Sequence, residues 1–403
     1  MHRPMSPERT QRSVTTALAL LLLPAFLTIV PTVTQANTLP IITNVTTTAD
    51  GDSIVIGYDI EDPDGDVMRV MLYEAGTDDP PFEPPVARGD IAEGVTTGTS
   101  KRIVLDVDEL VIAGPDTATD SDPGTGNTSE PLDFIPRLLA HDGTGYGGEM
   151  VAVDAVSGPD FMVDRYELTN MQYLAFVRSD GYERMEYWII DDGSLEIQET
   201  GWNYAGRFRW HAPKHWDLQA DPPWSQDPYS NVASSPVLGI SWFEAYAYCK
   251  WAGRRLPTSG EYREAAGLDD AAFPWGDELL PPPAPLAEDA DADAGRLYGY
   301  ANAKLGRSGY RFEGFTDDGY DIAAPVGSMS PEGDSPAGIA DAYGNVWEWC
   351  SDVVAVVDYT TYSCATRPLK GGSWATSMTE LEDASKDLCP LYRTDTAGFR
   401  CYR

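Results

Sequence analysis

The most constraining feature of this chain lies in its C-terminal two-thirds, where aromatic and turn-forming residues replace regular periodicity. From about residue 148 onward Trp, Tyr, Gly and Pro are dense, and neither a helical period nor strand alternation is sustained for long. Aromatic side chains supply large apolar surface for a core. Loops that enclose such a core need internal hydrogen bonds or bound ions for their backbone groups. The pattern predicts that long loops with buried aromatic side chains carry the fold from about residue 148 onward.

Two short helices are predicted inside this region. Ser241 is a good N-cap, and Glu244 three residues later completes a capping box at the start of a mostly apolar stretch over residues 241–252. A second helix is predicted over residues 259–266, with Thr258 as its cap.

Residues 37–113 have the pattern of a small all-β domain. Apolar residues alternate with more polar ones in three stretches that turn-rich segments separate: Ile54, Ile56, Tyr58 and Ile60; Met68, Val70 and Leu72; Ile103, Leu105 and Val107. Short strands at this spacing predict an immunoglobulin-like or fibronectin-III-like β-sandwich. In the Asp-Pro-Asp-Gly-Asp run, the carboxylates of Asp62, Asp64 and Asp66 could bind calcium, but a tight acidic turn is favoured.

Residues 114–147 are predicted as a flexible acidic linker, because Asp, Thr, Ser, Gly and Pro fill residues 114–132 almost without large apolar side chains. A second stretch of biased composition, residues 281–295, is Pro-rich and then Asp/Ala-rich. Since it lies within the later domain, it is predicted as a surface loop.

The first 36 residues have the pattern of a secretory signal peptide. A basic start with Arg3, Arg9 and Arg12 precedes an apolar run over residues 17–30, and Ala36 ends a plausible small-residue cleavage site. The alternative is a membrane anchor, but the run is shorter than the ~20 residues that span a bilayer. We therefore expect a secreted, periplasmic or cell-surface protein with no transmembrane segment after cleavage.

The charge of the chain limits its partners. A formal net charge of −36 argues against nucleic acid and anionic membranes. It permits calcium, which takes hard oxygen ligands, although acidity can equally serve solubility. With four His and no Cys-x-x-Cys motif in the chain, zinc or iron sites of ordinary spacing are poorly supported.

Several sequence blocks in the later domain resemble the formylglycine-generating enzyme, or sulfatase-modifying factor, family. They match it in order over about residues 148–403, at residues 166–176, 235–251, 253–266, 274–277, 344–349, 370–374 and 398–400. The strongest are Gly-Asn-Val-Trp-Glu-Trp at residues 344–349 and Lys-Gly-Gly-Ser-Trp at residues 370–374. The resemblance implies a mixed α+β fold over residues 148–403 with little regular structure, related to the C-type lectin fold, and bound calcium.

The resemblance also implies particular site residues. One calcium site would take Asp341 and Glu348 by side chain, with Gly344 and Val346 by carbonyl. A second would take Asn302 and Asp318 by side chain, with Ala303 and Tyr320 by carbonyl. Cys249 and Cys401 stand where the family has a disulfide, and one pair is expected among Cys350, Cys364 and Cys389, with the choice left open.

The two cysteines that bind copper in active members of the family have no counterpart in this chain. Active members bind copper through two cysteines shortly after the Gly-Gly-Ser block, because soft thiolates suit Cu(I). The corresponding positions hold Thr376 and Leu381, so copper binding and formylglycine generation are not expected. A related branch holds iron with three His; here Pro213 interrupts the helix that would bring His211 and His215 to one face.

Three functions are compatible with these residues. The preferred one is an exported, calcium-stabilised binding or interaction scaffold for a peptide, glycan or protein, with a degenerate copper site. The second is a family oxidoreductase with a non-standard active site that uses Cys389 or carboxylates near Thr376. The third is a purely structural envelope protein.

Overall fold

A computed structural model of the chain describes most of residues 38–403. The described ranges are 38–106, 134–276, 301–303, 320, 322–376 and 384–403, with gaps at residues 52, 78, 80, 83–85, 157, 191–199, 269–270, 355 and 359–362. The predicted signal peptide and the predicted loop at residues 281–295 lie outside them. Within the described ranges, every helix is too short or too polar to cross a bilayer.

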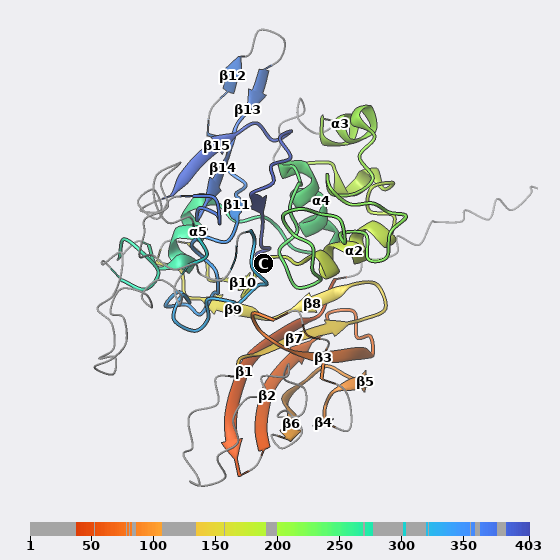
Figure 1. The fold of residues 1–403 in the computed structure, drawn as a ribbon, viewed down its shortest axis with the longest axis vertical. Helices are drawn as coiled ribbons and strands as arrows, with labels where there is room; N and C mark the ends of the chain where they lie inside the picture. The colour runs from red at the N-terminus through yellow and green to blue at the C-terminus, as the bar shows by residue number, and fades with distance from the viewer. Residues whose placement is uncertain are drawn as a thin grey trace, which may run out of the picture. The chain divides into compact units, whose positions relative to one another are not determined.

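The N-terminal part of the described chain forms two four-stranded sheets (Figure 1). Their orders are β1-β2-β6-β4 and β5-β3-β7-β8. The strands are β1 Ile41–Asp50, β2 Ser53–Glu61, β3 Met68–Glu74, β4 Ala87–Gly89, β5 Ala92–Val95, β6 Gly98–Asp106, β7 Pro136–His141 and β8 Tyr146–Gly148. One apolar cluster takes Ile56 and Ile103 from the first sheet and Val70 and Leu138 from the second. The all-β character agrees with the sequence pattern, while the immunoglobulin-like or fibronectin-III-like type stays a prediction.

The linker predicted over residues 114–147 is too long. Of residues 114–147, the structure describes 134–147, and these include β7 and most of β8. Strand β7 pairs with β3 from Arg69↔His141 to Glu74↔Pro136, and Leu138 is fully buried. The polar composition of residues 114–132 does not extend to this short apolar run, so the second sheet recruits it.

The Asp-Pro-Asp-Gly-Asp run forms a tight turn, as predicted. One carboxylate oxygen of Asp62 accepts the backbone N–H groups of Asp64 (2.8 Å) and Gly65 (3.0 Å). This is the way in which an Asp side chain substitutes for backbone in a turn.

The later domain is a mixed α+β structure with short elements, in agreement with the sequence. Its strands are β9 Met150–Val153, β10 Phe161–Asp164, β11 Trp347–Trp349, β12 Val356–Asp358, β13 Ser363–Ala365, β14 Arg367–Lys370, β15 Ser385–Leu388 and β16 Ala397–Gly398. Its helices are α2 Asn170–Arg178, the 3-10 turn η1 Met185–Tyr187, α3 Thr200–Phe208, α4 Trp242–Trp251 and α5 Ser259–Ala266. The central sheet has the order β15-β14-β11-β16.

Capping residues determine where three of the helices begin. Ser241 and Glu244 form the predicted capping box of α4, and Thr258 caps α5 in the same way. A third box, formed by Thr169 and Gln172 at α2, was not predicted, although the Thr-x-x-Gln spacing was visible in the sequence.

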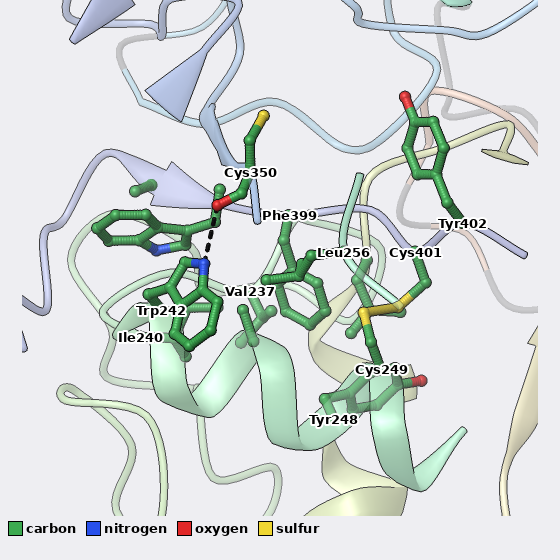
Figure 2. Close-up of a cluster of buried hydrophobic side chains, with 14 of the residues drawn as sticks. Val237, Ile240, Trp242, Tyr248, Cys249, Leu256, Cys350, Phe399, Cys401 and Tyr402 are labelled. Carbon is green, nitrogen blue, oxygen red and sulfur yellow. Dashed lines mark hydrogen bonds between the residues drawn. A yellow bond between two sulfur atoms is a disulfide. The ribbon is translucent and has the colours of Figure 1, made fainter. Parts of the chain in front are cut away.

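Helix α4 is joined covalently to the C-terminal strand region. Cys249 and Cys401 form a disulfide with a Cα–Cα distance of 5.8 Å, which is the pairing that the family resemblance implies. Figure 2 shows it within a buried cluster that includes Tyr248 and Phe399. Because the bond closes a loop across 152 residues of sequence, it restricts the unfolded chain strongly.

Candidate functional site

The candidate site is built around the turn that follows β14. Gly371 and Gly372 have φ angles of 93° and 84°, a region that favours glycine. A Cβ on Gly371 would overlap the hydroxyl of Tyr262, which itself donates to the carbonyl of Ala342. The two glycines therefore let the chain turn sharply against a buried tyrosine and present the next residues.

Thr376 closes this turn. Its hydroxyl accepts the backbone N–H of Ser373 at 3.0 Å and lies 3.1 Å from the Ser373 hydroxyl, and its own N–H donates to the Ser373 carbonyl at 2.8 Å. A hard hydroxyl oxygen thus stands at the first of the two positions where the family has a copper thiolate. The second position, Leu381, lies outside the described residues, and its identity also excludes a thiolate. These residues do not fit the family's copper site.

An aromatic row borders the turn. The backbone N–H of Trp374 donates to the Asn345 carbonyl at 2.8 Å. The Trp374 ring stacks on Tyr229 with a centroid distance of 5.8 Å, and Tyr229 meets the His215 ring edge-on at 5.6 Å. The Trp374 ring is thereby brought together with two rings from the distant segment 215–229.

A charged cluster continues the aromatic row. One carboxylate oxygen of Asp395 lies 2.8 Å from His215 Nε2 and 2.8 Å from Lys214 Nζ. Burial raises the pKa of the Asp395 carboxyl, but the hydrogen bonds from Lys214 and His215 outweigh it and lower the pKa overall. The Asp395 and His215 side chains keep 29% and 22% of their surface exposed. This cluster therefore offers a charged edge that a ligand can reach.

The two histidines considered in the sequence do not converge. His211 is 62% exposed and lies 3.7 Å from Glu183, whereas His215 faces Asp395. Neither lies in a helix. The two side chains therefore face different carboxylates.

A lysine lies over an aromatic ring near the same end of the central sheet. Lys386 of β15 places its ammonium 4.3 Å from the ring centroid of Trp347 in β11. Burial lowers the pKa of Lys386 from 10.5 to about 8. The cation–π contact favours the charged form and opposes that shift.

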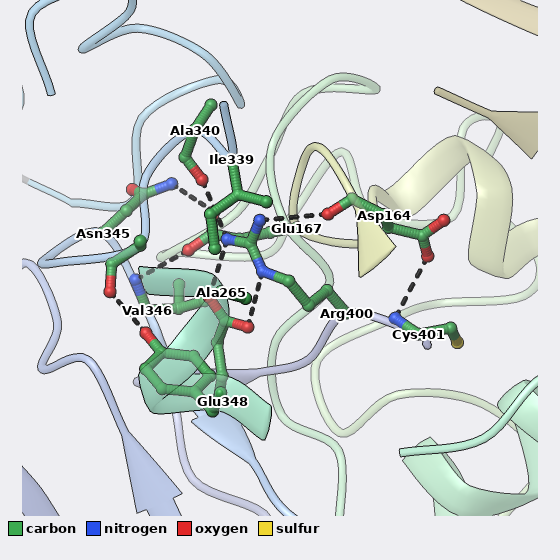
Figure 3. Close-up of polar contacts among 12 residues, drawn as sticks. Asp164, Glu167, Ala265, Ile339, Ala340, Asn345, Val346, Glu348, Arg400 and Cys401 are labelled. Carbon is green, nitrogen blue, oxygen red and sulfur yellow. Dashed lines mark hydrogen bonds and ion pairs between the residues drawn. The ribbon is translucent and has the colours of Figure 1, made fainter. Parts of the chain in front are cut away.

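Beneath the site, Arg400 forms a fully buried ion pair with Glu348 (Figure 3). The guanidinium donates to both Glu348 oxygens at 2.7 Å. Its other N–H groups reach the carbonyls of Asp164, Arg165 and Ala340. Burial raises the pKa of Glu348 while Arg400 lowers it; with two short bonds between them, the pair is held in its charged form.

Two further carboxylates lie close to this pair. Glu167 accepts from the Asn345 side chain at 2.5 Å and from the Val346 N–H at 3.2 Å, and Asp341 accepts the Gly327 N–H. Burial, and then the charges of Asp341 and Glu348, raise the pKa of Glu167 well above its ordinary value. Burial raises the pKa of Asp341 to about 6.

The residues predicted for the first calcium site are close in space but differently engaged. Both Glu348 oxygens accept bonds from Arg400, so this carboxylate has a guanidinium partner where calcium was predicted. The Gly344 N–H donates to the Gly371 carbonyl at 2.8 Å, which links the predicted calcium loop to the glycine turn. Within the described ranges, no three His, Cys, Asp or Glu side chains gather closely enough to hold a metal ion.

The second predicted calcium site is described only in part. Asn302 is buried, and its amide nitrogen donates to the Ile322 carbonyl and the Asn345 side-chain oxygen, both at 3.0 Å. The Asn302 carbonyl accepts the Asn345 N–H at 2.7 Å, so the two predicted sites adjoin. Ala303 and Tyr320 are described, whereas Asp318 lies outside the described residues. Calcium at either site stays a prediction.

Sequence reasoning missed three groups at this site. Arg400 falls in the matching block at residues 398–400, but its role was not predicted, although a buried Glu348 requires a cationic or hydrogen-bonding partner. Tyr229 and Asp395 carried no recognisable spacing, because their neighbours at the site come from distant segments.

Comparison with known proteins identifies the family of the later domain. The model for the "Sulfatase-modifying factor enzyme 1-like domain" matches residues 132–403. A formylglycine-generating enzyme from Thermomonospora curvata is 31% identical over 252 residues, which cover 58% of this chain and 71% of that protein. A hercynine oxygenase from Mycolicibacterium thermoresistibile is 29% identical over 309 residues, covering 69% of this chain and 59% of its own length.

A protein named as inactive is similar as well. An "Inactive C-alpha-formylglycine-generating enzyme 2" from Bos taurus is 25% identical over 263 residues, which cover 62% of this chain and 79% of that protein. The mouse formylglycine-generating enzyme matches at 32% identity, but this chain covers only 49% of its length.

Replacing Arg400 by Met is expected to lower the free energy of unfolding by about 3–5 kcal/mol, because it leaves the buried Glu348 charge without its partner. Urea unfolding measures this. The matched control is Arg184→Met in the exposed Arg184–Glu186 pair, where the expected loss is at most about 1 kcal/mol. Equal losses in the two variants would contradict the role given to Arg400.

Lys386 is expected to make stability depend on alkaline pH. With a lowered folded-state pKa, the unfolded chain binds more protons between about pH 8 and about pH 10, so raising the pH stabilises the fold. Urea unfolding at pH 7 and pH 10 should therefore show the wild type gaining stability relative to Lys386→Met. Lys386→Arg should show no gain, and a difference from Lys386→Met that is constant with pH would rule out the lowered pKa.

Proposed function

Because the chain belongs to the sulfatase-modifying factor family, we propose that it is an exported binding protein that keeps the family's scaffold and has lost its copper chemistry. The observation that carries this proposal is Thr376, whose hydroxyl closes the turn where the family has its first copper thiolate. A similar protein that is named inactive supports the proposal, because it indicates that members of this family can lack the reaction.

The proposed ligand surface is the aromatic row with its charged edge. Stacked Tyr229 and Trp374 rings offer flat apolar contact, and His215, Lys214 and Asp395 offer donors and an acceptor beside them. Binding sites for peptides and glycans combine these two kinds of group. The chain's net charge of −36 favours neutral or cationic ligands.

The N-terminal sheets fit this role as a spacer or interaction module of the predicted sandwich type. The apolar run within residues 1–36, after its basic start, supports export. Both points belong to the proposal, as does placement in the secreted, periplasmic or cell-surface space.

An oxidoreductase with a non-standard site is the second candidate. It is favoured by the similarity to a hercynine oxygenase and by the His215–Asp395 pair beside the turn. A histidine paired with a carboxylate can act as a general base. Such an enzyme would need a centre other than the missing cysteine pair.

Incubating the purified chain with copper and a Cys-x-Pro-x-Arg peptide is expected to give no formylglycine, measured by mass spectrometry. The variant Thr376→Cys/Leu381→Cys, which restores both thiols, is expected to bind Cu(I) more tightly than the wild type. An active family member serves as the positive control. Any turnover by the wild type would overturn the binding-only function and favour the oxidoreductase.

Calcium is proposed as a stabiliser of the loops that carry Asn302 and Asp341. The support is a count of charges: three buried carboxylates, Glu167, Asp341 and Glu348, adjoin the single guanidinium of Arg400. A hard divalent cation with oxygen ligands would favour the ionised form of these carboxylates and fix the loops. Calcium would be held by Asp341 and by the Asn302–Asp318 set, with Glu348 left to Arg400.

Removing calcium with a chelator is expected to lower the melting temperature of the wild type, because a ligand present at 100 times its Kd stabilises a fold by about 2.7 kcal/mol. Thermal unfolding with chelator and with added calcium measures this. Asp318→Asn should reduce the calcium response by the share of the second site, and leave the share of the site at Asp341. Asp59 lies on β2 and contacts Asn44, so the control variant Asp59→Asn should keep the calcium response. A wild-type melting temperature that is insensitive to chelator would contradict both calcium sites.

A further inference from the structure

Three cysteines remain outside the Cys249–Cys401 disulfide, and the structure separates them into a pair and a single thiol. All three are buried. The Cys350 thiol approaches the carbonyl of Glu348, at 3.9 Å, within the tightly packed core of the central sheet. The Cys364 thiol instead hydrogen-bonds the thiol of Cys389.

Strand pairing explains why Cys364 and Cys389 meet. Strands β14 and β15 are antiparallel, with Arg367 opposite Leu388 at their ends. Cys389 directly follows Leu388, and Cys364 lies in β13, three residues before Arg367. Both cysteines therefore leave the same end of the β14–β15 ladder, where their thiols come into contact.

We propose that Cys364 and Cys389 form a second disulfide, which clips together the two ends of the chain segment that carries the candidate site. The residues between them include β14, the Gly371–Gly372 turn with Thr376, and β15 with Lys386. The inference does not depend on the binding function proposed above.

The bond forms by thiol–disulfide exchange with an external disulfide, either of a thiol oxidoreductase or of a small molecule. A thiolate of the pair attacks that disulfide and expels one thiol; the second cysteine then displaces the other, completing the Cys364–Cys389 bond. Two S–H bonds are lost, one S–S bond is gained, and the external disulfide takes up the two electrons and two protons. The Cys249–Cys401 bond already requires oxidising conditions of this kind.

Burial affects when this exchange can occur. Burial, and then the neighbouring Cys389 thiol, raise the pKa of Cys364 to about 12, so little thiolate forms in the folded, reduced chain. Because the thiolate is the reactive form, folded reduced protein should oxidise slowly. The bond is expected to form while the chain folds, and to be protected afterwards.

The test uses the full chain, exported to an oxidising compartment, purified without reductant and unfolded in the presence of an alkylating agent. We expect one alkylated cysteine per chain, Cys350, and a proteolytic peptide that links Cys364 to Cys389 in mass spectra. Cys350→Ser is the matched control: it should lose the free thiol and keep the linked peptide. Cys364→Ser should expose two alkylated cysteines, Cys350 and Cys389.

Three alkylated cysteines in the wild type would overturn the proposal. A linkage of Cys350 to either partner would do so as well, and so would Cu(I) recovered on the intact Cys364 and Cys389 thiols. If Cys364→Ser fails to fold, Cys389→Ser and the wild-type peptide map decide the question independently. In the doubly substituted Cys364→Ser/Cys389→Ser chain, limited proteolysis between residues 365 and 388 should be faster than in the wild type, and equal rates would contradict the clip.

Discussion

The buried guanidinium of Arg400 is the interaction on which the later domain depends. All five of its N–H donors are used: two by the Glu348 oxygens and three by the carbonyls of Asp164, Arg165 and Ala340. These acceptors come from β10, β11 and connecting loops. Strands β11 and β16 are only three and two residues long, so the few hydrogen bonds between them stabilise the sheet only weakly. One side chain therefore supplies the cross-links that a longer sheet would provide.

This arrangement also governs the electrostatics near the site. Arg400 compensates Glu348, while Glu167 and Asp341 remain close by as buried carboxylates whose pKa values are raised. Their hydrogen bonds, from Asn345, Val346 and Gly327, fix the loop that precedes β11. Since Gly344 of that loop bonds Gly371 of the turn, the charge network and the candidate site form one connected unit.

The sequence allowed good prediction of local features and poor prediction of distant contacts. The caps at Ser241 and Thr258 were predictable because the bonds involved span three residues. The Arg400–Glu348 pair spans 52 residues, and the His215–Asp395 pair spans 180, so no spacing rule reveals either of them. The predicted linker is too long because it was predicted from the average composition of a long stretch. Strand β7 depends instead on a few buried residues such as Leu138. Family resemblance supplied the long-range pairing of Cys249 with Cys401 that local rules could not.

The turn after β14 combines residues that shape the backbone with the position at which the family has its first copper thiolate. Gly371 is required by its positive φ angle and by the nearby Tyr262 hydroxyl, and Gly372 by its positive φ angle. Thr376 is under a different constraint: its hydroxyl satisfies Ser373 within the turn, a structural task that needs no metal. The same residues that identify the family by sequence are thus those that shape the backbone, and they carry no information about whether the reaction survives.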